Sequence, residues 1–172
     1  MSSAAQAPGN DLNKVDVPIP SNENTEEHNS GSSNPKTASN EHHAKRKPLI
    51  LVVDDDARFA DSIANALTRT GYDVLKAYDG NVGLAMALVK RPELIVLDSR
   101  MRKRSGYLVL EYLRTHLDSP IPVIMLSENE GTRHQTYALM LGAAAFLAKP
   151  IEADKVVNAV VDTMQRVYNL AK

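Results

Sequence analysis

Cysteine does not occur among the 172 residues, so disulfide bonds, cysteine-ligated zinc and thiol chemistry are all excluded. No apolar run approaches the roughly 20 residues that a membrane-spanning helix needs. The first residues also lack the basic start and apolar stretch of a signal peptide, so we expect a cytoplasmic protein. The formal net charge is only −1, so no overall field attracts nucleic acid or an anionic membrane. We therefore expect neither direct nucleic-acid binding nor membrane binding.

The chain divides into two unequal parts. Residues 1–47 contain no aromatic residue, show no periodic spacing of apolar residues and are rich in Ser, Asn, Pro and Glu. Such a segment cannot bury enough apolar surface to offset the entropy lost on ordering, so we expect a disordered tail. Its basic end, Lys45-Arg46-Lys47, is either a docking patch or, as we favour, a solvated boundary. Residues 48–172 are expected to form one folded domain.

Strand and helix signals alternate through the second part. Short apolar runs predict five strands, at about 49–54, 73–77, 94–98, 121–126 and 144–148. Amphipathic segments predict five helices, at about 57–70, 81–90, 106–117, 130–141 and 152–169. We expect Leu108, Tyr112 and Leu113 on the core side of the third helix, and a stripe ending at Val167 on the last. Five successive strand–helix units predict an α/β fold with a parallel sheet and helices on both faces.

Acidic residues follow two of the predicted strands. One apolar run leads directly into Asp54, Asp55 and Asp56, and another leads into Asp98. In an open α/β sheet the ligand site lies beyond the carboxyl ends of the strands, so Asp54, Asp55 and Asp98 are expected to converge. Two carboxylates about 4 Å apart repel by roughly 4 kcal/mol at an effective dielectric near 20. Mg²⁺ is the expected counterion, because it takes oxygen ligands and often shares them with a phosphoryl group.

Three strand ends carry groups that suit phosphoryl chemistry. Asp98 could attack phosphorus and form an aspartyl phosphate, although a lone Asp more often caps a turn or a helix. Ser127 could donate to a phosphoryl oxygen or cap the following helix. Lys149 would pair with a phosphoryl group or simply lie on the surface before a helix, and Pro150 permits a cis bond that would turn it toward the acids. Together, these strand-end groups favour one phosphoryl-binding site.

The chain over about 48–170 resembles the receiver domain of two-component response regulators and is similar to the stand-alone chemotaxis response regulator. The resemblance implies a flavodoxin-like, doubly wound five-stranded parallel sheet with strand order 2-1-3-4-5 and helices on both faces. The motifs that carry it are Leu51-Val52-Val53-Asp54-Asp55-Asp56, Leu97-Asp98-Ser99-Arg100-Met101 with Gly106, Met125-Leu126-Ser127, and Phe146-Leu147-Ala148-Lys149-Pro150.

The resemblance also implies a chemistry for the acidic residues. Asp98 would accept a phosphoryl group from a phosphohistidine on a sensor histidine kinase or a histidine phosphotransfer protein. Mg²⁺ would be bound by Asp55, Asp98 and the backbone carbonyl of Arg100, with Asp54 acting through water in the outer shell. The protein would catalyse only its own phosphorylation and dephosphorylation, so we do not expect an enzyme that acts on other substrates.

A conformational switch is implied as well. Ser127 and Lys149 would bind phosphoryl oxygens, Ser127 would move toward the phosphoryl group, and Phe146 would rotate inward behind it. The surface of the fourth helix, fifth strand and fifth helix would then change shape. This surface would contact a downstream protein and could also support a homodimer, or the phosphate would pass along a phosphorelay.

One loop departs from the family pattern. Arg102 stands where the family usually has proline, and Arg100, Lys103 and Arg104 make the same loop strongly basic. The loop could steer anionic donors or lower metal affinity by repulsion, or it could be solvated and without a role. We also hypothesise that Arg100 and Asn129 tune the dephosphorylation rate by controlling water access.

Two other functions remain open from the sequence. One is a phosphate-independent, receiver-like adaptor, which the basic loop favours and the intact set of Asp55, Asp98, Ser127 and Lys149 opposes. The other is a phosphatase with an Asp nucleophile. Such hydrolases usually carry a second Asp two residues after the first, where this chain has Arg100.

Overall fold

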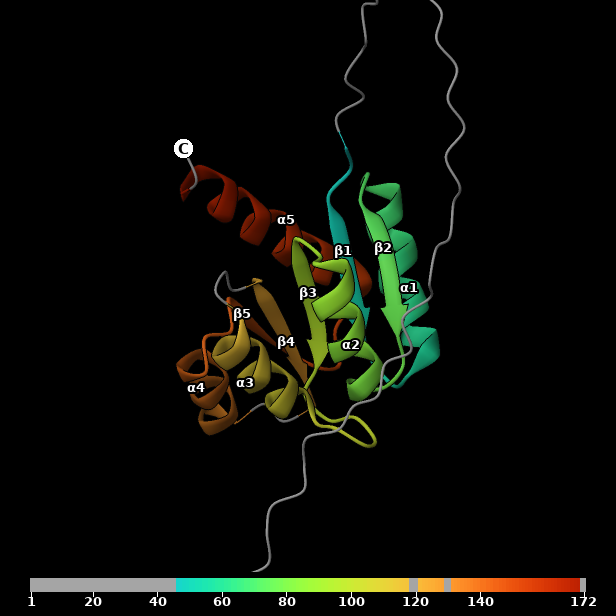
Figure 1. Ribbon diagram of the computed structural model, residues 1–172. Coiled ribbons are helices and arrows are strands. Elements are labelled where there is room, and N and C mark those ends of the chain that lie inside the picture. The colour runs from blue at the N-terminus through green and yellow to red at the C-terminus, as the bar shows by residue number, and fades with distance from the viewer. Residues whose placement is uncertain (1–45, 118–120, 129–130, 171–172) are drawn as a thin grey trace, which may run out of the picture. The chain divides into compact units, whose positions relative to one another are not determined.

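The computed structural model describes residues 46–117, 121–128 and 131–170. Five parallel strands form one sheet in the order β2-β1-β3-β4-β5 (Figure 1). The strands are β1 (Leu49–Val53), β2 (Asp73–Ala77), β3 (Leu94–Asp98), β4 (Val123–Ser127) and β5 (Ala145–Ala148). The helices are α1 (Ala57–Arg69), α2 (Gly80–Lys90), α3 (Gly106–His116), α4 (Thr132–Met140) and α5 (Ala153–Leu170). The predicted doubly wound, flavodoxin-like fold and its strand order are confirmed.

The core lies on both faces of the sheet, in two clusters. Successive side chains of a strand point to opposite faces, so Leu51 and Val53 enter one cluster while Ile50 and Val52 enter the other. Helices α2, α3 and α4 contribute to the first cluster, and α1 and α5 contribute to the second. This double coverage explains why the strand sequences are continuous apolar runs rather than alternating ones.

Several predicted element boundaries are wrong by one or two residues. The fourth strand is Val123–Ser127 rather than 121–126, because Pro122 has no N–H to donate to a neighbouring strand. The Pro122 carbonyl still accepts from the Ile95 N–H at 2.9 Å. The fourth helix begins at Thr132, and residue 130, its predicted start, lies outside the described residues.

Two residues predicted for the core lie on the surface. Leu108 is 54% exposed and Val167 is 40% exposed. The sheet side of α3 is formed instead by Val109, Leu110 and Leu113, and residues two apart on a helix lie about 200° apart around its axis. Val167 is exposed because the last turns of α5 extend beyond the sheet (Figure 1).

The predicted tail and its basic end are described only from residue 46 onward. There Arg46 forms an ion pair with Glu93, and the second Glu93 oxygen accepts from the Leu49 N–H at 2.7 Å. Residues 1–45 of the predicted tail lie outside the described residues, and the domain boundary at 47/48 stays a prediction. Within the described part of the chain, none of the helices has both the length and the apolar character needed to cross a bilayer.

Candidate functional site

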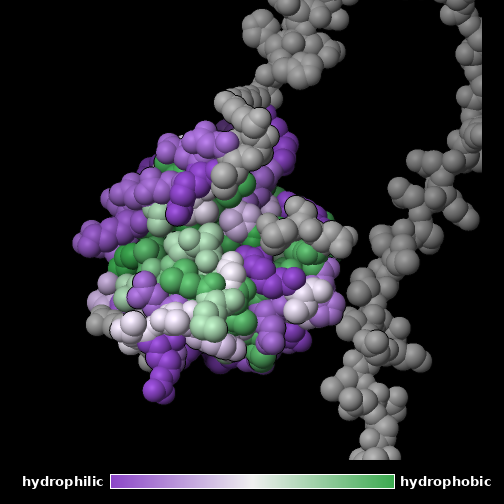
Figure 2. All heavy atoms as spheres, turned by 90° about the vertical axis from the view of Figure 1, so that its left-hand side faces the viewer, coloured by the Kyte–Doolittle hydropathy of each residue, from purple (hydrophilic) through white to green (hydrophobic). Residues whose placement is uncertain are grey.

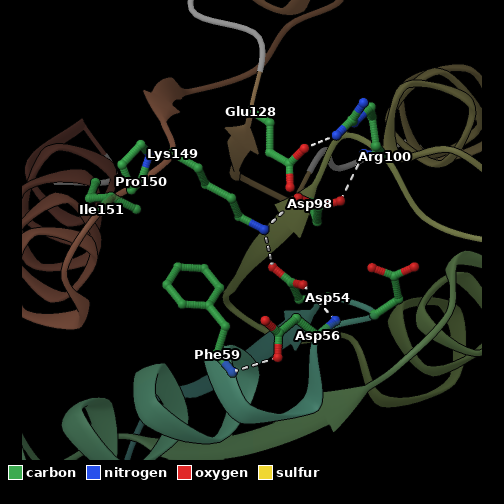
Figure 3. A pocket seen from close by; sticks show the side chains of 10 residues that line it. Asp54, Asp56, Phe59, Asp98, Arg100, Glu128, Lys149, Pro150 and Ile151 are labelled. Atoms are coloured by element: carbon green, nitrogen blue, oxygen red, sulfur yellow. Dashed lines mark hydrogen bonds and ion pairs between the residues drawn. The ribbon is translucent and has the colours of Figure 1, made fainter.

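The carboxyl ends of β1, β3 and β5 open into one cavity of ≈570 Å³. Figure 3 shows the side chains of Asp54, Asp98 and Lys149 pointing toward one another from these separate strand ends. The lining residues are Asp54, Asp55, Asp56, Phe59, Asp98, Arg100, Glu128, Lys149, Pro150 and Ile151. The structure therefore brings together segments that are almost 100 residues apart in the chain.

Lys149 stands between two buried carboxylates. Its Nζ donates to Asp54 Oδ2 and to Asp98 Oδ1, at 2.7 Å in each case (Figure 3). Asp54 is 1% exposed and Asp98 is 3% exposed, so bulk water solvates neither carboxylate well. The ammonium offsets the repulsion that the sequence predicts for these acids. The Lys149–Pro150 peptide bond is cis.

Backbone groups hold the remaining oxygens of the two acids. The Arg100 N–H donates to Asp98 Oδ2 at 2.8 Å, and the Asp56 N–H donates to Asp54 Oδ1 at 3.0 Å. Both contacts span two residues, the usual way in which an Asp side chain folds back on its own turn. Asp56 itself accepts from two N–H groups at the start of α1, so it caps that helix instead of joining the cluster.

Gly106, the first residue of α3, fixes the distance between this helix and the end of β3. A Cβ at this position would lie 2.0 Å from the carbonyl oxygen of Asp98. Only glycine permits this approach without a shift of the backbone. The start of α3 therefore packs directly on the peptide that carries the Asp98 side chain.

The surroundings of Asp98 and Lys149 shift both of their pKa values upward. Burial raises the pKa of Asp98 and the charge of Asp54 adds to the rise, while the hydrogen bond and charge of Lys149 oppose it. Burial works to lower the pKa of Lys149, but its hydrogen bonds to Asp54 and Asp98 outweigh this effect, so the pKa is raised. Lys149 is therefore a cation at neutral pH, and the Asp98 carboxylate is more basic than an ordinary one.

Asp55 lies at the edge of the cavity and contacts the basic loop. Its Oδ2 accepts from the Arg102 N–H at 3.4 Å and lies 3.7 Å from Arg102 Nε. The Arg102 side chain is 85% exposed, so this ion pair is weak. Asp55 and Asp98 line the same cavity.

Ser127 ends β4, but its side chain does not line the cavity. It is fully buried, and its Oγ accepts from Ser99 Oγ at 3.0 Å. Its carbonyl accepts from the Lys149 N–H at 2.7 Å, which ties the end of β4 to Lys149. Phe146 is partly buried in β5, in register with Met125 of β4. Neither of the two predicted switch residues is among those that line the cavity.

A family model described as the response regulator receiver domain matches residues 50–161. The chain belongs to this family. Among solved structures, this receiver is similar to the receiver domain of the Francisella response regulator 1452, with 30% identity and a TM-score of 0.67 over 70% of this chain and 99% of that one. It is also similar to a CheY-like receiver domain protein from Methanospirillum hungatei JF-1, with 25% identity and a TM-score of 0.66 over 70% and 96% of the two chains.

Curated relatives of the receiver are named as transcriptional regulators. The probable transcriptional regulator ycf27 of Porphyridium aerugineum is 34% identical over 122 residues, which are 71% of this chain and 50% of that protein. The DNA-binding dual master transcriptional regulator RpaA of Synechocystis sp. is 33% identical over 129 residues, 73% of this chain and 54% of that protein. The chain thus spans about half the length of these relatives.

The donor set of the receiver fits Mg²⁺ chemistry. In the ranges 46–117, 121–128 and 131–170, no three acidic or histidine side chains are grouped as metal ligands. Mg²⁺ needs no such group, since it usually keeps several waters and uses one or two carboxylates. Asp55 and Asp98 line one cavity and can supply these two, with the Arg100 carbonyl nearby in sequence. Asp55 would have to release Arg102 to do so.

Two residues of the site, Glu128 and Phe59, were not predicted from the sequence. Glu128 forms an ion pair with Arg100, and Figure 3 shows the two side chains pointing toward each other across the cavity. The Phe59 ring lies 4.7 Å from Lys149 Nζ, a cation–π contact. Glu128 could have been found because it follows Ser127 at a strand end, and Phe59 because it lies in the first turn after Asp56. Asn129 lies outside the described residues.

The remaining cations of the basic loop also have partners. Lys103 Nζ lies 3.2 Å from Asp79 Oδ2, and Arg104 Nε donates to Asn81 Oδ1 at 3.0 Å. These contacts are on the surface, where each contributes little to stability. They attach the loop to the start of α2 and leave much less unpaired charge than the sequence suggests.

Proposed function

We propose that this receiver accepts a phosphoryl group on Asp98 from a phosphohistidine of a sensor histidine kinase or a histidine phosphotransfer protein. The observation that carries the proposal is the buried Asp98 carboxylate, held by Lys149 at an open cavity that Asp54 and Asp55 also line. A carboxylate oxygen of Asp98 attacks phosphorus, an O–P bond forms, and the P–N bond of the donor breaks. The imidazole leaves with the electron pair and takes up a proton.

The chain's own residues have distinct roles in this transfer. Lys149 orients the Asp98 carboxylate and pairs with the incoming phosphoryl oxygens. Asp55, Asp98 and the Arg100 carbonyl would hold Mg²⁺, with Asp54 in the outer shell, and the ion would neutralise charge on the transferring group. Ser127 would then turn its hydroxyl toward a phosphoryl oxygen, and Phe146 would move inward behind it. The protein acts on no other substrate.

The signal would leave through the face formed by α4, β5 and α5. Figure 2 views the molecule from this side and shows hydrophobic side chains gathered on it. Helix α4 carries three exposed large hydrophobic residues, Tyr137, Leu139 and Met140. Such a patch is typical of a surface that contacts another protein, either a downstream target or a second copy of the chain.

The proposal is tested by incubating the protein with acetyl phosphate and Mg²⁺ and measuring its intact mass. We expect an adduct of one phosphoryl group that disappears in Asp98→Asn and in the presence of excess chelator. Asp61→Asn is the matched control, because Asp61 is partly exposed outside the cavity and its partners among the described residues are Lys76 of β2 and Tyr78. No adduct with any donor would support the phosphate-independent adaptor, and multiple turnover of unrelated phosphate esters would support a phosphatase.

A second candidate function is control of transcription, which the similarity to ycf27 and RpaA favours. DNA affinity comes largely from an excess of Lys and Arg at the phosphates, so the net charge of −1 supports the proposal that this chain does not itself bind DNA and acts through protein contacts. The test is binding of labelled duplex DNA at low salt, with and without acetyl phosphate. We expect no shift in either state, whereas a salt-sensitive shift would show direct DNA binding.

A further inference from the structure

The Lys149 ammonium has an aromatic partner in addition to the two carboxylates. Its Nζ lies 4.7 Å from the centre of the Phe59 ring, within the range of a cation–π interaction. An ammonium can donate three hydrogen bonds, and two of them go to Asp54 and Asp98. Figure 3 shows the ring and the two carboxylates around the end of the Lys149 side chain. The proposed function uses the carboxylates but gives Phe59 no role.

The capping of α1 fixes the place of the Phe59 ring. Phe59 is the third residue of α1, and its N–H donates to the Asp56 carboxylate at 3.2 Å. Its carbonyl accepts from Ser62 Oγ at 2.7 Å. Helical side chains tilt toward the N-terminus of their helix, so a residue of the first turn leans toward the preceding strand end, which here carries Asp54. Asp56 therefore serves the site indirectly, by placing the ring that faces Lys149.

The ring and the ammonium meet in a largely apolar part of the site. Phe59 is partly buried against the core cluster that α1 and α5 form, as is Ile151. Phe59, Pro150 and Ile151 are the apolar residues among those that line the cavity. The Lys149 side chain is only 14% exposed. A cation–π contact is stronger where water is excluded, so this one should contribute more than a contact on the surface.

We propose that Phe59 is a positioning residue for phosphoryl transfer, which holds the Lys149 ammonium beside Asp98 while the transferring oxygens become its partners. The inference rests on the proposed function. Before transfer, the charges of Asp54 and Asp98 hold the ammonium. When Asp98 becomes an acyl phosphate, it no longer offers a free carboxylate. The Phe59 ring is unchanged by the reaction, so it continues to hold the ammonium in place. It also keeps water from one side of the ammonium, which strengthens the attraction to the transferring oxygens.

The test replaces Phe59 by phenylalanines that carry one, two or three ring fluorines, introduced at a suppressed stop codon. Fluorine withdraws charge from the ring face and weakens its attraction for a cation in steps, while the ring keeps nearly the same size. The phosphoryl adduct is followed by intact mass at increasing acetyl phosphate and saturating Mg²⁺. We expect the maximal rate constant to fall in steps, to about one-fifth with three fluorines, while the half-saturating concentration of acetyl phosphate changes little.

Further variants separate the charge distribution of the ring from its bulk. Phe59→Tyr keeps an attractive ring face and should retain the wild-type rate, whereas Phe59→Leu should be at least as slow as the trifluorinated protein. Trifluorophenylalanine at position 112 is the matched control, because Tyr112 stacks on His116 outside the cavity, and it should leave the rate unchanged. One rate throughout the fluorinated series, or equal slowing by the control, would overturn the positioning role.

The contact itself can be measured without phosphorylation. Protons above an aromatic ring are shielded, so in protein that carries isotope-labelled lysine the Lys149 Cε protons should resonate upfield, and Phe59→Leu should abolish the shift. A wild type without this shift would overturn the present inference and leave the proposed function standing. A wild type that shows the shift but forms no adduct with any donor would overturn the proposed function, and the positioning role with it.

Discussion

Lys149 compensates the negative charge of two buried carboxylates, because its ammonium group forms ion pairs with both Asp54 and Asp98. Lys149→Met would leave two buried carboxylates without their partner, a change that typically costs about 3–5 kcal/mol. We expect a loss of this size in urea unfolding near pH 7, measured without Mg²⁺. Lys155→Met, at an exposed position of α5, should cost almost nothing. Equal stability of the two variants would contradict the assigned charge balance.

The stability lost in Lys149→Met should depend on pH. The pKa of Asp98 is already raised in the folded state, so its contribution to stability is present at low pH and is lost as pH rises through that pKa. Without Lys149 the pKa of Asp98 should rise further, because the hydrogen bond and charge of Lys149 are the main interactions that lower it. The deficit of Lys149→Met relative to the wild type should therefore shrink as pH falls toward 3.8, the ordinary Asp value. A deficit that is constant with pH would show that lost packing, and not charge, explains the variant.

Arg102 competes with metal for Asp55 if the proposed ligand set is right. Arg102→Ala should tighten Mg²⁺ binding by up to about fivefold, since an exposed ion pair contributes at most about 1 kcal/mol. Isothermal titration calorimetry measures this directly, and Arg58→Ala, an exposed residue of α1, is the control. Unchanged affinity would support the view that the basic loop has no role at the metal site.

At the scale of elements, the junction between β3 and α3 is the least tolerant position of the site. Gly106→Ala would drive its Cβ into the Asp98 carbonyl, so we expect the free energy of unfolding to fall by roughly 1–3 kcal/mol and less phosphoryl adduct to form.

Gly131→Ser tests a glycine whose surroundings do have room for a side chain. The nearest atom to its Cβ is 3.8 Å away, and a serine N-cap should stabilise α4 by a few tenths of a kcal/mol. Thermal unfolding and intact mass measure both effects.

Element types could be predicted because β1, β3 and β4 are continuous apolar runs covered on both faces. The rotation of α3 was predicted wrongly, because Leu108 was placed in the core with Leu113. The buried residues Val109, Leu110 and Leu113 have the spacing of one helix face, which leaves Leu108 54% exposed. The convergence of Asp54, Asp98 and Lys149 follows from strand ends alone. Their positions place Glu128 and Phe59 near the site, but their contacts with Arg100 and Lys149 depend on side-chain directions that no spacing in the sequence reveals.

At the scale of the whole molecule, the exposed patch on α4 predicts phosphorylation-dependent association. Met140 is 80% exposed there, and Met140→Glu should weaken the proposed dimer or target contact by roughly tenfold, because a buried Met contributes about 1.5–3 kcal/mol. Val89→Glu, at a 75% exposed position of α2, is the matched control. Sedimentation velocity with and without acetyl phosphate measures dimerisation. Equal weakening by both variants would place the contact elsewhere.

The account depends most on the identity of the acceptor carboxylate. Borohydride reduces an acyl phosphate to an alcohol, so protein treated with acetyl phosphate, Mg²⁺ and then borohydride records which Asp carried the phosphate. Peptide sequencing by mass spectrometry should find homoserine at position 98 and Asp at positions 54 and 55. Homoserine at another position, or an adduct without any at position 98, would contradict the proposed site.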